Sequence, residues 1–392
     1  MKNQLLLIAT IFIVLTCSAQ NNITKKEQYI RTSGKLPALA YGLGEDRLGG
    51  AKMGYIDTNV LLKIIDSTKD LYHVQLSKNR SAYIDKAFAK FESDSFKTKK
   101  FYLTGSFVAK GDSAFDYLNI NMEEKLPYKA SMEINPAKII VDIFGVQSNT
   151  NWITQLSSLK EIKNVYYNQV EDDVLRVTIE LKHAQHWGYV IGYKGKSLVV
   201  KVNRQPKLLD IKRLTIAIDA GHGGTNTGAG GVRTNASEKA FTLIFAKALE
   251  KSLKKLGVKN IIMTRTFDTS FDMKDRILFL QEKNPNLVIS LHLNSTSNAA
   301  TKGTSTFYKH IGFRSISTAI LKRMLELKLD EYGNVGHFNF GLNAPTSFPN
   351  CLVEIAFLSN EEDEKKIISP LFHKQVATKI QLGIMDWLKG MK

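Results

Sequence analysis

Hydrophobic and polar residues alternate along this chain in a pattern that changes twice. The first pattern occupies residues 36–92, where short strand-like runs such as residues 60–64 and 71–76 are separated by turn residues such as Asp66-Ser67. Short strands bounded by turn residues are typical of a small β-barrel. We therefore predict a small all-β barrel over residues 36–92.

A second β-rich stretch covers residues 101–203. Three of its runs alternate hydrophobic and polar residues with a period of two: residues 138–145, 174–181 and 197–202. That period is expected of strands with one face in a core, so the stretch is predicted to be an all-β sandwich. Residues 204–213 hold few large hydrophobic residues and are predicted to be a linker.

From Leu214 to Lys392, strand-like runs alternate with helical ones. The predicted strands are residues 214–220, 260–265, 287–294, 304–308 and 351–358. The predicted helices are residues 237–256, 272–283, 315–329 and 371–388. In the first of these helices, Ala240, Ile244, Ala248 and Leu249 are predicted to form the apolar face. Alternation of this kind predicts an α/β domain with a mostly parallel central sheet, so the chain as a whole is multidomain.

The first 19 residues are predicted to be a signal peptide. Lys2 supplies the positive start, residues 5–15 the apolar stretch, and Cys17-Ser18-Ala19 a small-residue cleavage site. The apolar run is shorter than the roughly 20 residues that span a bilayer, so no transmembrane span is expected in the mature chain. In an alternative interpretation, Leu15-Thr16-Cys17 loosely resembles a lipobox and Cys17 carries a lipid. Either way the protein is expected in the periplasm or cell envelope.

Net charge and cysteine content limit which partners and which kinds of site the protein can have. The 392 residues contain 54 Lys and Arg against 37 Asp and Glu, a formal net charge of +17, and two cysteines. A basic exported protein is expected to meet an anionic wall polymer or lipid headgroups rather than nucleic acid. Two cysteines, one of them in the leader, exclude a disulfide framework and a cysteine-rich zinc site.

Three side chains at strand ends and at a helix start suggest metal chemistry. His222 lies between Gly221 and Gly223 just after a predicted strand, His292 ends another, and Glu238 opens the helix that follows the glycine-rich loop. Two imidazoles and one carboxylate match a catalytic zinc site with one position open. Taken singly, each has an ordinary structural explanation, because a helix dipole favours a glutamate in the first turn and a strand-end histidine is often structural.

Glu354 lies in an apolar run, residues 352–357, that is predicted to be a buried strand. An ionisable residue is costly there unless it has a partner or a task. We predict that Glu354 is the catalytic acid and base, which takes a proton from water and returns it to the leaving amine. The alternative is a glutamate that faces solvent at the strand end.

Together these residues identify a family resemblance. Residues 218–224, 237–239, 264–276, 289–294 and 352–360 resemble, in order, motifs of the zinc-dependent N-acetylmuramoyl-L-alanine amidases. The resemblance implies Zn²⁺ on His222, Glu238 and His292, with Glu354 as acid and base, and hydrolysis of the amide between N-acetylmuramic acid and L-alanine in peptidoglycan. Asn294, which closes the fourth motif, is a candidate substrate-binding residue. Cell-wall remodelling or daughter-cell separation is the implied role.

Weaker resemblances cover the upstream segments. Residues 53–57, 70–76 and 82–84 are similar to small bacterial barrels related to Src-homology folds, and residues 138–145 and 174–181 to the AMIN domain, a sandwich that targets envelope amidases to peptidoglycan.

The chain also departs from the amidase pattern. Asn226 stands where the family usually has an aspartate, and a basic residue common before the last motif is replaced near Leu342-Asn343. Division-associated members carry an inserted helix after the second histidine that covers the zinc. Here Ser315 follows residues 303–308 closely, which leaves little room for such a helix. The sequence therefore predicts activity without an activator protein.

Two other functions share these features. The chain could be an inactive peptidoglycan-binding envelope protein, although a dead domain need not keep all four residues. It could also be a zinc peptidase that cuts the stem peptide, which would more usually show a His-x-x-Glu pair. His183, His186, His310, His337 and His373 are assigned no role, Cys351 is assigned to the core, and ligand type alone does not exclude cobalt or manganese.

Overall fold

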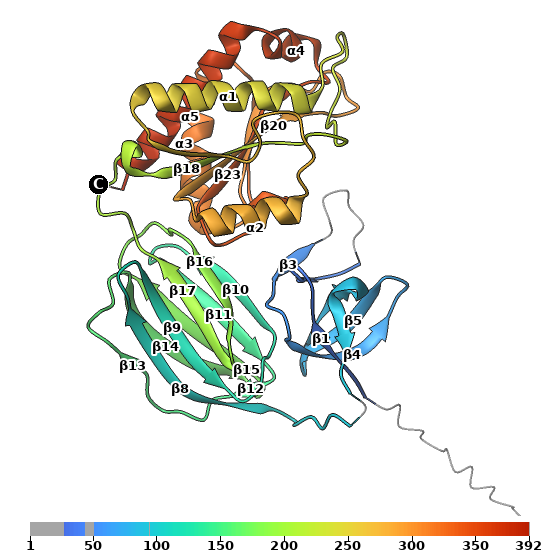
Figure 1. Ribbon diagram of the computed structural model, residues 1–392, viewed down its shortest axis with the longest axis vertical. Helices are drawn as coiled ribbons and strands as arrows, with labels where there is room; N and C mark the ends of the chain where they lie inside the picture. Colours follow the sequence, from blue (N-terminus) through green and yellow to red (C-terminus); the bar gives the residue numbers. More distant parts are fainter. Residues whose placement is uncertain (1–26, 44–50, 94, 392) are drawn as a thin grey trace, which may run out of the picture.

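The computed structural model describes residues 27–43, 51–93 and 95–391, and Figure 1 shows three units in chain order. The predicted signal peptide and Cys17 lie outside the described residues. No helix among the described residues is long and apolar enough to cross a membrane.

The N-terminal unit is a small β domain. Its sheet has the order β3-β2-β6-β5-β4-β1-β7. The strands are β1 (Gln28–Thr32), β2 (Ala38–Ala40), β3 (Lys52–Tyr55), β4 (Leu61–Ser67), β5 (Leu71–Ser77), β6 (Arg80–Asp85) and β7 (Ala89–Phe91). The domain begins before residue 36, because β1 pairs with both β4 and β7 and buries Ile30 completely. Five residues with two inward side chains are too short a pattern to mark a strand. The likeness to Src-homology barrels stays a prediction.

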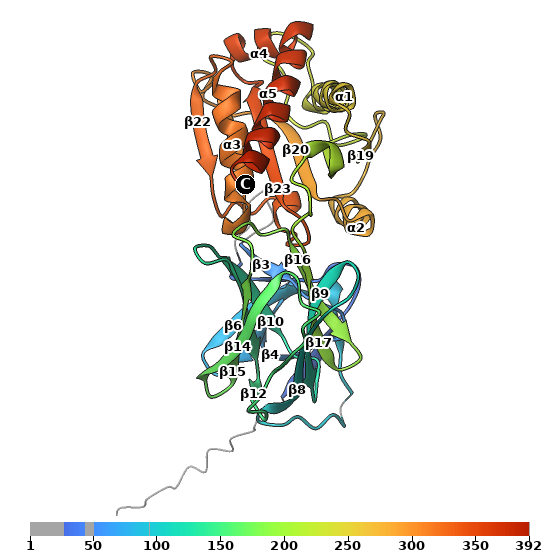
Figure 2. The ribbon, with the colours of Figure 1, turned by 90° about the vertical axis from the view of Figure 1, so that its left-hand side faces the viewer.

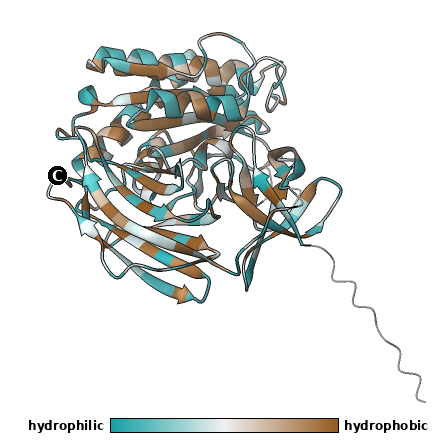
Figure 3. Cartoon of the chain, turned by 60° about the horizontal axis from the view of Figure 1, so that its bottom comes forward, coloured by the Kyte–Doolittle hydropathy of each residue, from teal (hydrophilic) through white to brown (hydrophobic). Residues whose placement is uncertain are grey.

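The second unit is a sandwich of two sheets. One has the order β10-β11-β15-β14, and the other β12-β8-β9-β17-β16 with β13 beside β8. Its strands are β8 (Tyr102–Gly111), β9 (Phe115–Met122), β10 (Tyr128–Glu133), β11 (Lys138–Phe144), β12 (Val146–Gln147), β13 (Thr154–Gln155), β14 (Ile162–Glu171), β15 (Val174–Leu181), β16 (Tyr189–Lys194) and β17 (Ser197–Asn203). Figure 3 shows hydrophobic and hydrophilic residues alternating along these strands, and β17 buries every second residue, as its pattern predicted.

The third unit confirms the predicted α/β domain. Its sheet has the order β19-β18-β20-β23-β21-β22, and the first four strands are parallel. The sheet is mixed, since β21 runs antiparallel to β23 and carries β22 parallel to itself. The strands are β18 (Thr215–Ala220), β19 (Asn260–Met263), β20 (Leu287–Asn294), β21 (Thr304–Phe307), β22 (Glu331–Val335) and β23 (Asn350–Phe357). The helices are α1 (Glu238–Leu256), α2 (Met273–Lys283), α3 (Arg314–Leu325), α4 (Glu361–Ile367) and α5 (Pro370–Lys389).

Helices cover both faces of this sheet (Figure 2). On β18, Ile216 and Ile218 face the core shared with α1, α3 and α5, whereas Ala217 faces the smaller core under α2. The predicted apolar face of α1 was wrong in part. Ile244 is 40% exposed, and the buried face runs through Phe245, Leu249 and Leu253.

Two elements escaped the sequence analysis, and one helix is shorter than predicted. The edge strand β22 has little hydrophobic pattern, and α4 begins with four acidic residues under an Asn360 cap. Helix α3 ends at Leu325 rather than at residue 329. The chain turns at Lys328, whose φ of 55° is incompatible with a continuing helix.

Residues 204–213 are packed rather than free. The Arg204 guanidinium forms a 2.7 Å ion pair with the fully buried Asp116 of the sandwich, and Ile211 belongs to the core of the α/β domain. Trp187 of the sandwich also packs on Trp387 of α5, with ring centroids 5.2 Å apart. The linker therefore joins two domains that are in direct contact.

Candidate metal centre

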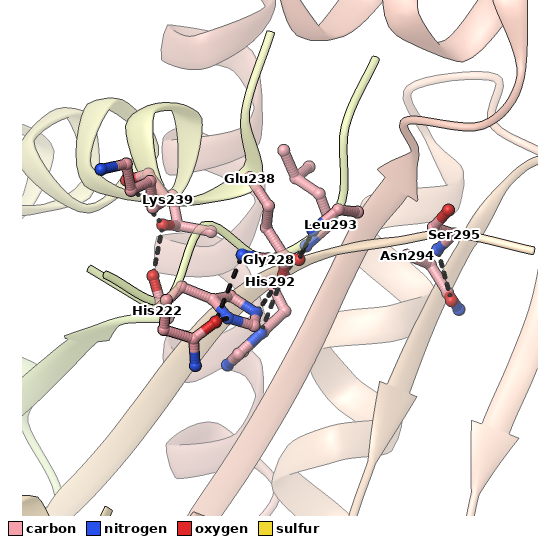
Figure 4. A network of polar contacts seen from close by, with 12 residues as sticks. His222, Gly228, Glu238, Lys239, His292, Leu293, Asn294 and Ser295 are labelled. Carbon is pink, nitrogen blue, oxygen red and sulfur yellow. Dashed lines mark hydrogen bonds and ion pairs between the residues drawn. The ribbon is translucent and has the colours of Figure 1, made fainter. Parts of the chain in front are cut away.

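Parallel strands bring the two predicted histidines to one edge of the sheet. Strand β18 ends at Ala220, which pairs with Leu291 of β20, so His222 and His292 both lie at carboxyl ends of neighbouring strands. Ligand sites of α/β sheets are found at such ends. Helix α1 begins at Glu238 after the loop that carries His222, and its first turn points back to the same place (Figure 4).

The three side chains are in direct contact. Oε1 of Glu238 lies 3.0 Å from Nε2 of His222 and 3.0 Å from Nδ1 of His292. The potential ligand atoms of all three residues lie within 4.8 Å of one another, and among the described residues this is the group that offers such a set. The structure thus brings together the three predicted ligands.

Charge interactions dominate this cluster. Burial favours the neutral form of Glu238, but its hydrogen bonds and Coulomb attraction to the two histidines outweigh burial and keep its pKa well below the usual value. Burial likewise disfavours the charged form of His222, but the contact with Glu238 wins and raises the pKa of His222. Glu238 is therefore an ionised carboxylate, ready to bind a cation.

The surroundings of the cluster fit a bound metal. Nε2 of His292 is buried and has no hydrogen-bond partner among the described residues. A Cβ at Gly221 would lie 2.4 Å from Cε1 of His292, and one at Gly228 would lie 2.4 Å from Oε2 of Glu238, so only glycine leaves room for these side chains. Two imidazoles and a carboxylate are also the donor set of catalytic zinc.

Asn226 determines which nitrogen of His222 faces this cluster. Its Oδ1 lies 2.8 Å from Nδ1 of His222 and accepts a second hydrogen bond from the backbone N–H of Gly228, 3.3 Å away. An amide oxygen only accepts hydrogen bonds, so Nδ1 carries a proton and Nε2 is the nitrogen that faces Glu238. In the metal-free protein Nε2–H donates to the Glu238 carboxylate, and loss of that proton would free Nε2 to bind a cation. Asn226 thus performs the orienting task that outer partners of metal-binding histidines perform.

We expect Asn226→Ala to weaken metal binding by about 10–100-fold, the usual cost of losing such a partner. Asn226→Asp keeps an acceptor at the same place and should bind the metal at least as tightly as the wild type. Competition with a chromogenic chelator measures both affinities, and Thr227→Ala, in the same loop, is the control. Wild-type affinity in Asn226→Ala would contradict this role.

A buried ion pair supports the loop that carries His222. Nη1 of Arg276 lies 2.7 Å from Oδ1 of the fully buried Asp219, and Nη2 donates to the carbonyl oxygen of His222 at 3.1 Å. The sequence analysis named these two residues only as parts of motifs. An aspartate inside an apolar strand was the signal for a buried partner.

Glu354 lies opposite His292 on the neighbouring strand. Strand β23 runs parallel to β20, and the two residues are partners in register. Partners in register share one face of a sheet, so the Glu354 carboxyl lies on the face that bears the His292 ring. Val353 and Ile355 on either side are fully buried, whereas Glu354 is half-buried.

Asn294 is placed differently. It ends β20, and its amide oxygen accepts a hydrogen bond from the backbone N–H of Ser295 at 2.8 Å. Figure 4 shows it to one side of the three clustered residues. Its role in substrate binding stays a prediction.

A cleft of about 400 Å³ opens beside the cluster. His222, His292, Arg276, Met273 and Phe340 are among its lining residues. The Phe340 ring stands edge-on to His292, with centroids 4.9 Å apart. Sequence analysis missed Phe340 and Met273, because nothing in their local pattern distinguishes them from core residues.

Four further histidines make structural contacts away from the cluster. His183 pairs with Glu161, and ring nitrogens of His186, His310 and His373 bond backbone carbonyls. Cys351 is buried, and burial raises the pKa of its thiol.

Comparison with known proteins defines the class. Residues 216–386 match the family model described as N-acetylmuramoyl-L-alanine amidase, and residues 108–202 match the AMIN domain. The α/β domain therefore matches an amidase, and the sandwich before it matches an AMIN domain. Residues 216–386 belong to the N-acetylmuramoyl-L-alanine amidase family and form the amidase domain of this chain, which follows an AMIN domain.

Similar proteins carry related descriptions. The probable cell wall amidase LytH of Staphylococcus saprophyticus is 27% identical over 204 residues, which are 52% of this chain and 66% of that protein. LytH of Staphylococcus aureus is 26% identical over 54% of this chain and 70% of its own length. Among solved structures, the Clostridium difficile 630 amidase is 28% identical over 46% of this chain and 98% of its own, with a TM-score of 0.44. The CwlV catalytic domain of Bacillus (Paenibacillus) polymyxa is 30% identical over 45% and 98%, with a TM-score of 0.43.

Proposed function

We propose that this protein is exported and uses zinc to hydrolyse the amide bond between N-acetylmuramic acid and L-alanine in peptidoglycan, for cell-wall remodelling or daughter-cell separation. The observation that carries the proposal is the meeting of His222, Glu238 and His292, whose ligand atoms lie within 4.8 Å of one another beside a cleft.

In this proposal His222, Glu238 and His292 hold the zinc ion. Bound there, zinc would supply Lewis-acid chemistry, which polarises the scissile carbonyl and makes water acidic enough to attack at neutral pH. The chain's own contribution is to keep the Glu238 carboxylate ionised and Nε2 of His222 facing inward.

Glu354 is the proposed acid and base. Its carboxylate takes one proton from the attacking water and delivers it to the amine nitrogen of L-alanine as the C–N bond breaks, so that it ends the cycle ionised. Its register opposite His292 supports this role, because a general base must lie near the metal-site residues to reach the proton of the attacking water. Asn294 and the Phe340 wall are proposed substrate contacts.

The upstream domains are proposed to hold the enzyme on the wall. The match of residues 108–202 to the AMIN domain and the positive net charge support an anionic wall polymer as partner. We place the protein outside the cytoplasm, in the periplasm or cell envelope, after removal of residues 1–19.

Activity is proposed to need no activator protein. The segment between β20 and β21, residues 295–303, contains no helix, so this part of the described chain supplies no plug for the metal site.

Product analysis tests the proposed reaction. Purified protein is incubated with peptidoglycan without any added partner, and the released fragments are examined by mass spectrometry and amino-terminal labelling. We expect stem peptides with a free L-alanine amine and intact glycan strands. New amines at other stem positions would indicate a peptidase, and wall binding without product would indicate an inactive anchor.

A further inference from the structure

The N-terminal β domain packs against residues that line the cleft beside the metal site. Leu36 and Tyr55 of that domain pack in the same hydrophobic cluster as Met273 and Phe340, which line the cleft. Both ribbon views place β3 beside the α/β domain, next to α2 in Figure 1 (Figures 1 and 2). The domain thus lies directly behind two residues of the cleft lining.

A lysine joins the two domains at this point. Nζ of Lys309 donates one hydrogen bond to the backbone oxygen of Lys52, at 2.9 Å, and another to Oδ1 of Asn339, at 3.0 Å. Asn339 directly precedes Phe340, whose ring stands against His292. An ammonium group has three donors, and the contacts within the described residues use two of those of Lys309.

Lys52 and Lys274 complete a cluster of three lysines around this junction. Nζ of Lys52 lies 3.3 Å from the Tyr55 hydroxyl, and Nζ of Lys274 lies 3.7 Å from the centre of the Phe88 ring. All three lysines are half-buried, and in the described part of the chain none of them has a carboxylate within ion-pair distance. By contrast Lys35, at the same junction, pairs with Asp275 at 3.0 Å.

The charges of these lysines also affect one another's pKa. Burial, followed by the charge of Lys52, lowers the pKa of Lys309 to about 8, and burial with the charge of Lys274 lowers the pKa of Lys52. Partly buried ammonium groups without a counter-charge raise the free energy of the unliganded protein, and an anion placed among them relieves that cost.

We infer that Lys52, Lys274 and Lys309 form a subsite, shared between the N-terminal β domain and the catalytic domain, for a carboxylate of the peptide stem. The inference rests on the proposed function, which puts an acidic stem peptide in the adjoining cleft. Lys274 directly follows Met273, and Lys309 donates to Asn339, which precedes Phe340, so the cluster adjoins two residues of the cleft lining. A stem bound at the metal by its first amide can therefore extend its later carboxylates toward the lysines.

A matched pair of compounds tests the subsite. One is N-acetylmuramoyl-pentapeptide with free carboxylates, and the other is the same compound with every carboxylate of the peptide converted to carboxamide. Kd is measured by calorimetry on the Glu354→Ala protein, so that no turnover is needed, and KM is measured on the active enzyme. The variants are Lys52→Met and Lys309→Met, with Lys35→Met as the control that removes an equal charge from the same junction.

The wild type should bind the acidic compound about tenfold more tightly than the amidated one, as expected for one charge-assisted contact. Lys52→Met and Lys309→Met should lose most of this preference, whereas Lys35→Met should keep it. Lys309 contacts the backbone oxygen of Lys52, which Lys52→Met leaves in place. The Lys52→Met variant therefore remains informative if Lys309→Met unfolds. Equal affinity of the wild type for both compounds, or an equal loss in all three variants, would overturn the inference. A binding preference without turnover would leave the subsite standing and reject the proposed hydrolysis.

Discussion

Glu354→Ala is expected to keep its zinc and lose amidase activity by roughly 10²–10⁴-fold, the usual contribution of a positioned general acid and base. Glu354 is in register with His292 but is not one of the three clustered residues proposed to hold the metal, so its removal should separate chemistry from metal binding. The measurement is kcat on a soluble muropeptide together with the zinc content of the same sample.

Two further variants make this result specific. Glu354→Gln keeps the shape of the side chain but no longer accepts the proton, so it should be nearly as inactive as Glu354→Ala. Glu331→Ala, in the exposed edge strand β22 of the same sheet, should be as active as the wild type. The assignment fails if Glu354→Gln retains more than about a tenth of wild-type activity, since general acid and base catalysis is worth at least that factor.

Glu238→Gln is expected to lose both zinc and activity. Glu238 supplies the only negative charge of the three clustered residues, and loss of an outer partner alone already costs about 10–100-fold in metal affinity, so loss of the carboxylate ligand should exceed that. The two carboxylate oxygens of Glu238 accept hydrogen bonds from the backbone N–H groups of Ala229 and Leu293, and glutamine keeps one of these two acceptors in a side chain of the same shape.

Metal analysis after dialysis measures the outcome, and thermal melting checks the fold. Glu250→Gln on the same helix removes a charge that pairs only with Lys254 at (i, i+4), and should leave metal content unchanged. A Glu238→Gln protein that holds zinc as firmly as the wild type would mean that Glu238 is a helix-start residue and no ligand.

Much of the α/β domain could be predicted from the sequence because its pattern is local. Strand β18 and helix α1 follow from apolar periodicity, the Ser237 start and the Gly257 stop. The buried face of α1 was misjudged at Ile244, because a helix with mixed residues does not reveal which side its neighbours cover. Strand β22 and helix α4 are held by contacts distant in sequence and leave little local signal.

The candidate site likewise has residues that could be predicted from local sequence and residues that could not. Three site residues could be found from the sequence because each is a polar residue between glycines or inside an apolar strand: His222, His292 and Glu354. The part played by Asn226 depends on a ring nitrogen 2.8 Å away. The roles proposed for Phe340 and the three lysines depend on contacts between the N-terminal domain and the α/β domain. No spacing in the sequence predicts those contacts.

Activity measured before and after the metal is removed provides the most direct test of the proposal that the amidase depends on zinc. Chelator-treated enzyme is mixed with peptidoglycan, and free L-alanine amino termini are counted before and after stoichiometric zinc is returned. The account predicts no new termini without metal and full release with one zinc per chain, in the wild type and not in Glu354→Ala. Undiminished release from protein shown to contain no metal would contradict it.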